Sequence, residues 1–251
     1  MTAKLAAKRI GEVTLAMADG NVAVVTLDAP QRRNALTPSL AGNLTEAFEL
    51  IEADDDVRAA VVTGSGSAFC AGADLGQLDQ ANEAILRTIY SAFLRVRASS
   101  LPTVAAVRGP AVGAGFNLAM ACDLRITGHS ARFESRFVRL GLHPGGGASW
   151  MLRGALGRSV ASAALLFDEV IDGATAERIG LAWRCVDDSA ALEEAIVLAR
   201  RAARAPRSLS QRIKATLDDA GVAATHEESI EIELERQLWS FAQPWFAAGR
   251  P

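Results

Sequence analysis

The chain has few cysteines and no large excess of either charge, which excludes several large classes of protein. Its 251 residues include only three cysteines, an odd number at spacings that fit no pair of metal ligands. We therefore expect reduced thiols, no disulfide framework and no metal site. The 26 basic and 29 acidic residues nearly balance, and the net charge of -3 provides no positive field for nucleic acid.

Long apolar runs are also missing, although 50% of the residues are hydrophobic. The longest run is far shorter than the roughly 20 residues that a helix needs to cross a bilayer, so we expect no membrane span. The first residues, MTAKLAAKRIGEV, are basic but lack the apolar stretch of a secretory signal. Length and composition favour one sizeable globular domain, and we expect it to be cytoplasmic.

The first half of the chain alternates between strand and helix patterns. Two β-runs, 12–18 and 21–28, flank a hairpin signal, Asp19-Gly20. Thr37 and Pro38 together predict a helix start. The other elements predicted in this half are buried strands at 59–64 and 102–109, a helix at 82–98, and a loop, helix and strand within 109–127. Alternating strands and helices form crossover units, so we predict an α/β fold with a mostly parallel sheet.

From about residue 155 the pattern is almost entirely helical. The helices predicted there span 159–167, 175–181, 190–204, 206–219 and 226–242, with a last short strand at 184–186. We therefore divide the chain into an α/β core, residues 1–200, and a helical C-terminal region, residues 201–251.

Two loops rich in small residues follow buried strands. The first is FCAGADL, residues 69–75, and the second is GPAVGAGFNL, residues 109–118. Small residues let a ligand approach the main chain, and the helix predicted to begin at about Ala114 would point free N–H groups outward. Two such loops side by side would suit a developing oxyanion. From these features alone, a phosphate would fit as well as a thioester carbonyl, and each loop alone is also compatible with an ordinary tight turn.

Several segments, taken in order, resemble the crotonase family, also called the enoyl-CoA hydratase/isomerase family. They are APQRRNAL (29–36), VVTGSGSAFCAGADL (61–75), PTVAAVRGPAVGAGFNLAMACDLRI (102–126), GLHPGGG (141–147) and the helical tail. The resemblance implies a crotonase-like spiral of ββα turns. It also implies that the helical C-terminal region makes homotrimers, which usually pair into hexamers.

The resemblance further implies an acyl-CoA thioester as ligand and assigns residues to it. The backbone N–H groups of Ala73 and Ala114 match the oxyanion-hole positions. Residues expected along the coenzyme A moiety are Arg33, Ala35, Ala71, Asp74, Leu75 and Gly76. Arginine suits phosphates by charge and geometry, although Arg32 and Arg33 also fit a solvated turn. Coenzyme A would be part of the substrate, so no separate cofactor is expected.

Three positions where family enzymes carry carboxylates differ in this chain. Hydratases use two glutamates around a water, and the matching residues here are Asn117 and Phe137. Some isomerases and a dehalogenase place a carboxylate just after the proline of the 141–147 loop, where this chain has Gly145. Asparagine can hold a water or an enolate but takes no proton at neutral pH, and phenylalanine does neither. Two hypotheses remain: an enzyme that stabilises a thioester enolate, with Asn117 at its catalytic centre, or a non-catalytic fatty acyl-CoA-binding protein.

Nearby polar residues have structural as well as catalytic interpretations. His143 belongs to a residue type suited to acid–base chemistry, but it occupies a position that is usually apolar and packed inward, which favours a structural role. We expect Glu134 at the surface or an interface, and Asp123 as a carboxylate that ties loops together. Cys70 and Cys122 are expected to fill the core.

Overall fold

The computed structural model describes residues 7–74, 76, 82–221, 223 and 225–248. Seven strands form the large sheet, in the order β1-β2-β3-β4-β5-β7-β10. Their bounds are β1 Lys8–Ile10, β2 Val13–Ala18, β3 Val22–Leu27, β4 Ala59–Gly64, β5 Thr103–Val107, β7 Leu124–Gly128 and β10 Arg184–Val186. The β1-β2-β3 pairs are antiparallel and all later pairs are parallel. The predicted α/β fold with a mostly parallel sheet is therefore confirmed.

A second, three-stranded sheet has the order β6-β8-β9. Its strands are β6 Pro110–Val112, β8 Arg132–Glu134 and β9 Ile171–Asp172. From β5 to β8, successive strands alternate between the two sheets: β5 and β7 belong to the large sheet, and β6 and β8 belong to the small one. This alternation gives the spiral of ββα turns. The small sheet was not predicted, because strands of two or three residues are too short to show a period-2 pattern.

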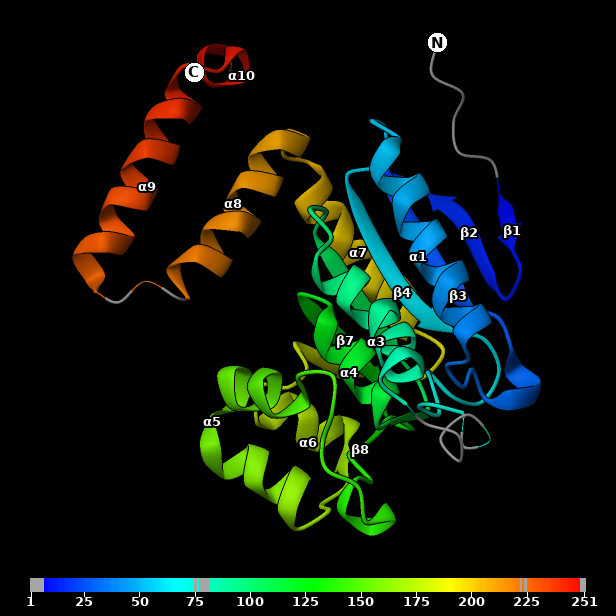
Figure 1. Cartoon of the computed structure of the whole chain (residues 1–251). Coiled ribbons are helices and arrows are strands. Elements are labelled where there is room, and N and C mark those ends of the chain that lie inside the picture. Colours follow the sequence, from blue (N-terminus) through cyan, green and yellow to red (C-terminus); the bar gives the residue numbers. More distant parts are fainter. Residues whose placement is uncertain (1–6, 75, 77–81, 222, 224, 249–251) are drawn as a thin grey trace.

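Helices cover both faces of the large sheet (Figure 1). Helices α1 (Pro38–Ala53), α3 (Glu83–Arg97) and α4 (Ala114–Ala121) lie on one face, and α7 (Ala191–Ala203) lies on the other. Successive residues of β3 and β4 alternate between the two cores, so Val25 and Val62 face α1 whereas Val24 and Val61 face α7. Burial on both faces explains why β4 reads as a continuous apolar run.

The helix starts follow ordinary capping chemistry. Thr37 caps α1 by accepting a hydrogen bond from the Leu40 N–H at 3.1 Å, and Pro38 occupies the first turn. Asn82 caps α3 in the same way through the Ile85 N–H at 3.1 Å. Both predicted helix starts are confirmed to within a residue.

A short 3₁₀ helix, η1 (Pro30–Arg32), precedes α1, and the remaining described helices lie in the second half of the chain. They are η2 Val138–Leu140, α5 Ala148–Leu166, α6 Gly173–Arg178, α8 Arg207–Ala220, α9 His226–Phe241 and α10 Pro244–Ala248. Helix α5 begins eleven residues before the predicted start at residue 159, and the sequence prediction was wrong there. The reason is Gly157, whose φ of 74° interrupts the helix and hides its first half from a continuous pattern.

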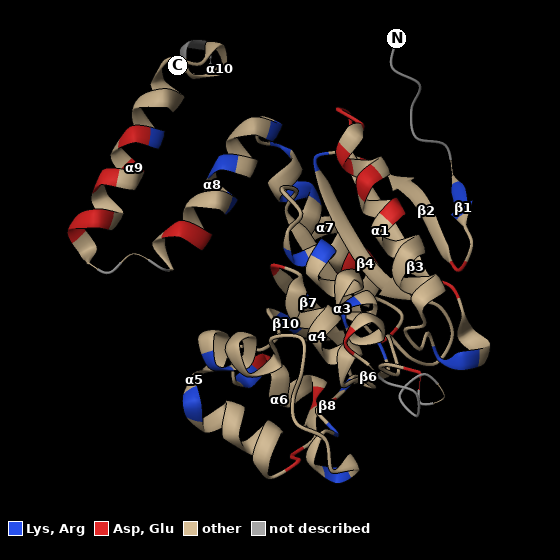
Figure 2. Cartoon of the chain, in the orientation of Figure 1, with Lys and Arg blue, Asp and Glu red and all other residues tan. Residues whose placement is uncertain are grey.

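Helices α8 and α9 form an arm that extends away from the core (Figure 1). Acidic residues lie along α9, whereas α8 has basic residues in its first part and acidic residues at its end (Figure 2). Arg212 of α8 lies 4.1 Å from the ring centroid of Trp239 on α9, which ties the two helices together. Several large apolar side chains of the arm remain exposed: Ile213, Leu217, Ile230, Leu234, Leu238 and Phe241. Among the described helices, none combines the length and apolar character needed to cross a bilayer.

Candidate active site

The two predicted loops lie side by side because their backbones are hydrogen bonded. The Cys70 N–H donates to the Pro110 carbonyl at 3.1 Å, and the Val112 N–H donates to the Cys70 carbonyl at 3.0 Å. These bonds form a short parallel bridge between the loop after β4 and strand β6. Loops that are 40 residues apart in sequence therefore share one rigid wall.

The 33–36 segment is attached to the other edge of the first loop. The Ala71 N–H donates to the Arg33 carbonyl at 2.9 Å, and the Leu36 N–H donates to the Gly72 carbonyl at 2.7 Å. The buried amide of Asn34 fixes the turn, accepting from the Ala29 N–H and donating to the Ala68 carbonyl, both at 2.9 Å. Residues Arg33 and Ala35 are thereby held beside the first loop.

Two glycines permit this close approach. A Cβ atom on Gly72 would lie 2.6 Å from the Val112 carbonyl oxygen, and the φ of Gly72 is 95°. A Cβ atom on Gly115 would lie only 2.2 Å from the Cys70 carbonyl oxygen. Such contacts are far below van der Waals distance, so any larger residue would push the two loops apart.

The N–H groups of Ala73 and Ala114 donate to no protein acceptor in the part of the chain that the structure describes. Ala114 is the first residue of α4, and the cap residue Gly113 has no side chain to bond the helix N-terminus. The positive end of the helix dipole adds to the field at this point. Two free donors at one wall suit an oxygen that gains negative charge.

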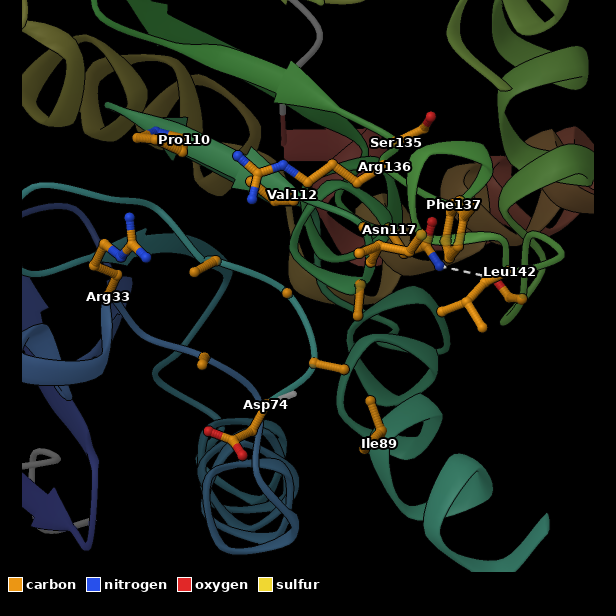
Figure 3. Close-up of a pocket in the computed structure, with 18 of the residues that line it drawn as sticks. Arg33, Asp74, Ile89, Pro110, Val112, Asn117, Ser135, Arg136, Phe137 and Leu142 are labelled. Atoms are coloured by element: carbon orange, nitrogen blue, oxygen red, sulfur yellow. Dashed lines mark hydrogen bonds between the residues drawn. The ribbon is translucent and has the colours of Figure 1, made fainter. Parts of the chain in front are cut away.

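Both donors line a cavity of about 620 Å³ (Figure 3). The cavity wall includes all but one of the predicted site residues: Arg33, Ala35, Ala71, Ala73, Asp74, Gly76, Ala114 and Asn117. The remaining one, Leu75, lies outside the described residues. The structure therefore brings together residues from three separate segments that the sequence alone placed only by resemblance.

One end of the cavity holds the altered positions. Asn117 is buried, and its Nδ2 donates to the Gly145 carbonyl at 3.0 Å. Its Oδ1 accepts no hydrogen bond from any described residue. Phe137 is half-buried beside it and packs against the main core (Figure 3). This end of the cavity is therefore largely apolar, with a neutral amide as one of its few polar groups.

Three arginines line the cavity: Arg32, Arg33 and Arg136. The Arg33 guanidinium is exposed, and no described residue pairs with it. Arg136 extends toward Pro110 and Val112 in Figure 3, and its Nε donates to Glu134 Oε2 at 2.7 Å. Arg32 instead forms an ion pair with Glu12 at 2.6 Å, which gives it a structural role. Arg33 is therefore the exposed, unpaired cation among these three arginines, whereas Arg136 lines the cavity while paired with Glu134, and sequence reasoning missed Arg136 as a cavity residue.

Among the other polar residues, Asp123 has the role predicted from the sequence, whereas His143 does not lie where it was expected. Asp123 Oδ2 accepts from the Thr103 N–H at 2.7 Å and from Lys214 Nζ at 2.8 Å, which confirms its role as a structural tie. Glu134 is half-buried and paired with arginines. His143 does not pack inward as expected. It is exposed at the cavity edge, where its Nδ1 contacts the Pro144 carbonyl at 2.8 Å.

The two cysteines expected in the core are confirmed there. Cys70 and Cys122 are buried, and burial raises the pKa of both thiols to about 12. Such thiols remain protonated at neutral pH, so neither serves as a nucleophile in this cavity.

Sequence reasoning also missed Tyr90 of α3, which lines the same cavity. A Cβ atom on Gly145 would lie 2.3 Å from Tyr90 Oη, so the hydroxyl occupies the space beside that glycine. The only signal in the sequence is that Tyr90 follows Leu86 by four residues, which places both on one face of α3. That this face meets the 141–147 loop depends on tertiary packing.

Comparison with known proteins agrees with these features. A family model described as enoyl-CoA hydratase/isomerase matches residues 17–244. A probable enoyl-CoA hydratase of Mycobacterium tuberculosis is 47% identical over 242 residues, covering 92% of this chain and 93% of that protein. The 1,2-epoxyphenylacetyl-CoA isomerase of Escherichia coli is 31% identical over 239 residues, covering 92% and 90%.

Solved structures agree as well. A probable enoyl-CoA hydratase/isomerase from Mycobacterium abscessus superimposes with a TM-score of 0.83 at 32% identity, covering 91% of this chain and 89% of that one. An enoyl-CoA hydratase from a Polaromonas species gives a TM-score of 0.86 at 29% identity, covering 92% of both chains.

Proposed function

Because the chain belongs to the enoyl-CoA hydratase/isomerase family, we propose that it binds an acyl-CoA thioester and polarises the thioester carbonyl. The observation that carries this proposal is the pair of free N–H groups, on Ala73 and Ala114, which face one cavity from two loops. The thioester oxygen would accept from both donors.

The two N–H groups would stabilise an enolate at the thioester. Negative charge on the carbonyl oxygen would lie between rigid donors that need no reorganisation, at the positive end of α4. Removal of one such donor costs about 3–4 kcal/mol of transition-state stabilisation in other enzymes. The rigidity comes from the Cys70 bridge to Pro110 and Val112.

The coenzyme A moiety would lie along the wall formed by the 33–36 segment and the first loop. Arg33 supplies an unpaired cation for phosphate, and the main chain at Ala35, Ala71 and Gly76 leaves room for an extended chain. Asp74 is placed on the same wall, and Leu75 keeps the role predicted from the sequence. Because coenzyme A belongs to the substrate in this proposal, no separate cofactor is invoked.

The acyl end favours enolate stabilisation over ordinary hydration. Of the described lining residues, only Asp74 carries a carboxylate, and it points away from Asn117 and Phe137 (Figure 3). Neither Asn117 nor Phe137 can accept a proton from water at neutral pH. Absence of a general base typically costs 10²–10⁴-fold in rate, roughly, so hydration would be slow.

A second candidate, a non-catalytic fatty acyl-CoA-binding protein, is favoured by the same two residues. Phe137 enlarges the apolar surface around the acyl chain instead of holding a water. The loops that would bind the thioester support both functions equally, so an activity measurement must separate them.

The binding test compares butyryl-CoA with free coenzyme A by calorimetry. Only the thioester can use both N–H groups, so it should bind more tightly than free coenzyme A. Arg33→Ala should weaken both ligands by a similar factor, because it removes a phosphate contact that they share. Equal affinities of the unaltered protein for the two ligands would contradict the oxyanion-hole assignment.

The activity test follows hydration of crotonyl-CoA by loss of its enoyl absorbance. We expect a weak rate in the unaltered protein and a gain in the double variant Asn117→Glu, Phe137→Glu. Each single variant should gain much less, because the two proton transfers act on one water. An unaltered protein as fast as an ordinary hydratase would refute the account of the missing base. A protein that binds acyl-CoA but turns over no enoyl-CoA substrate, including longer chains, would support the second candidate.

We also propose that the protein assembles as a homotrimer or as a hexamer of two trimers. Support comes from the α8–α9 arm, whose exposed apolar side chains Leu217, Ile230, Leu234, Leu238 and Phe241 exceed what a lone helical pair needs to expose. Light scattering at micromolar concentration should give three or six times the 26.4 kDa chain mass. A monomeric mass would reject the assembly.

A further inference from the structure

The half-buried Cys185 lies outside the cavity and has a histidine beside it. Cys185 belongs to β10, the edge strand of the large sheet, and its Sγ lies 3.4 Å from His129 Nδ1. Neither residue lines the 620 Å³ cavity. Whereas Cys70 and Cys122 are buried, this thiol is partly open to solvent, so a small reagent can reach it.

A carboxylate lies on the other side of the imidazole ring. Asp187 Oδ1 is 3.5 Å from His129 Nε2, and Cys185 faces the other ring nitrogen. A carboxylate that accepts from Nε2–H leaves the neutral ring with its lone pair on Nδ1, directed at the thiol. The histidine stands between the other two groups, so the three do not face a common point, and no such group among the described residues is placed to hold a metal ion. The order of thiol, imidazole and carboxylate suits removal of the thiol proton.

Backbone pairing holds the histidine beside β10. The His129 N–H donates to the Val186 carbonyl at 3.1 Å. The next residue, Ser130, donates its N–H to Asp188 Oδ1 at 2.9 Å. The turn after β7 is therefore joined both to β10 and to the segment that follows β10, which also carries the carboxylate partner of the imidazole. The contact between imidazole and thiol thus rests on a fixed backbone.

We propose that Cys185 is a modification site, where the thiol forms a mixed disulfide with a low-molecular-weight disulfide and His129 acts as general base. His129 Nδ1 takes the Sγ–H proton, and the thiolate attacks one sulfur of the reagent. A bond forms between Cys185 Sγ and that sulfur, while the bond between the two sulfurs of the reagent breaks. The departing thiolate receives the proton from His129, so Cys185 is oxidised and the reagent is reduced. This chemistry does not depend on acyl-CoA binding.

The exposure of the histidine and the carboxylate sets the size of the expected effect. The side chains of His129 and Asp187 are 64% and 83% exposed, so water screens their interaction. A positioned general base contributes about 10²–10⁴-fold in enzyme active sites, and we expect roughly tenfold at this open site. Asp187→Asn should slow the reaction less than His129→Ala, because an amide oxygen can still orient the ring.

The test follows the reaction with bis(2-hydroxyethyl) disulfide at pH 7 by mass spectrometry of the whole protein. This reagent is uncharged, so nearby charges do not favour its approach. The unaltered protein should gain one adduct, and Cys185→Ser should gain none. His129→Ala should slow the reaction roughly tenfold, and added imidazole should restore part of the rate, because a free base can replace the missing side chain. His226→Ala is the matched control, because it removes another exposed histidine, from α9, and should leave the rate unchanged.

Two results would refute the site as a whole: no adduct on Cys185, or equal rates for His129→Ala and the unaltered protein. A slowed variant that imidazole does not rescue would show that His129 only positions the strand, and would refute its role as base. A synthetic peptide of residues 181–190 makes the test independent of how the variant folds, because it contains the cysteine without His129. The folded, unaltered protein should react faster than this peptide, and an equal or lower rate would overturn the proposal.

Discussion

Gly115→Ala tests how closely the two loops must approach for the oxyanion hole to exist. The added methyl group would lie 2.2 Å from the Cys70 carbonyl oxygen and 2.8 Å from its carbonyl carbon. The φ of Gly115 lies outside the left-handed region, so the change introduces a contact and no backbone conformation unfavourable to alanine. The Cys70 carbonyl cannot move away freely, because it accepts from the Val112 N–H at 3.0 Å.

The size of the effect follows from that contact. A comfortable distance between a methyl carbon and an oxygen is about 3.4 Å, so the loops must separate by about 1 Å. Overpacking of this kind typically costs about 1–3 kcal/mol of stability. Misplacement of catalytic groups by about 1 Å can cost about 10²-fold in rate. The N–H groups of Ala73 and Ala114 would no longer converge on one oxygen.

The assay is calorimetry of butyryl-CoA and free coenzyme A, together with thermal unfolding. The variant should lose most of the preference for the thioester and retain affinity for coenzyme A, whose proposed contacts lie along the Arg33 wall. Gly42→Ala is the control, because Gly42 is exposed in α1 and a Cβ atom there meets nothing within 4 Å. That control should gain up to about 1 kcal/mol of stability and keep the preference. A folded Gly115→Ala protein with unchanged thioester preference would refute the reasoning.

Thiol chemistry and pH give further expected outcomes. In the folded protein only the half-buried Cys185 should react promptly with a disulfide reagent at pH 8. All three thiols should react in denaturant. Fast reaction of two or more thiols in the folded protein would contradict the burial of Cys70 and Cys122. Burial raises the pKa of those two thiols from an ordinary value of 9.0 to about 12 in the folded protein. The free energy of unfolding should therefore fall as pH rises above 9, by about 1.4 kcal/mol per pH unit for each thiol. Cys70→Ala should reduce that slope, and an unchanged slope would argue against the shift. Burial would raise the pKa of the Glu52 carboxyl, but hydrogen bonds, above all from Arg95, outweigh it and lower the pKa. Glu52→Gln should therefore lower the free energy of unfolding by about 1–3 kcal/mol at pH 7, and this loss should shrink below about pH 4. A loss of stability independent of pH would show that the carboxylate charge contributes nothing.

Local sequence determined the elements whose signals are contained in a few neighbouring residues. Thr37-Pro38 and Asn82 define helix starts because a capping side chain bonds an N–H only three residues ahead. The apolar run at 59–64 indicates a buried parallel strand because both of its faces meet helices. The resemblance grouped Ala73 and Ala114, and both residues line the same cavity.

Tertiary structure alone decided what lies opposite those loops. Tyr90 and Asn117 come from different helices and meet at Gly145, which belongs to a third segment. No pattern within any of the three segments encodes that meeting, because it arises from the packing of α3 and α4 against the 141–147 loop. Arg136 likewise reaches the cavity only because β8 pairs with β6. The sequence thus determined the two loops that supply free N–H groups, and the packing of distant segments determined which other polar groups line the cavity.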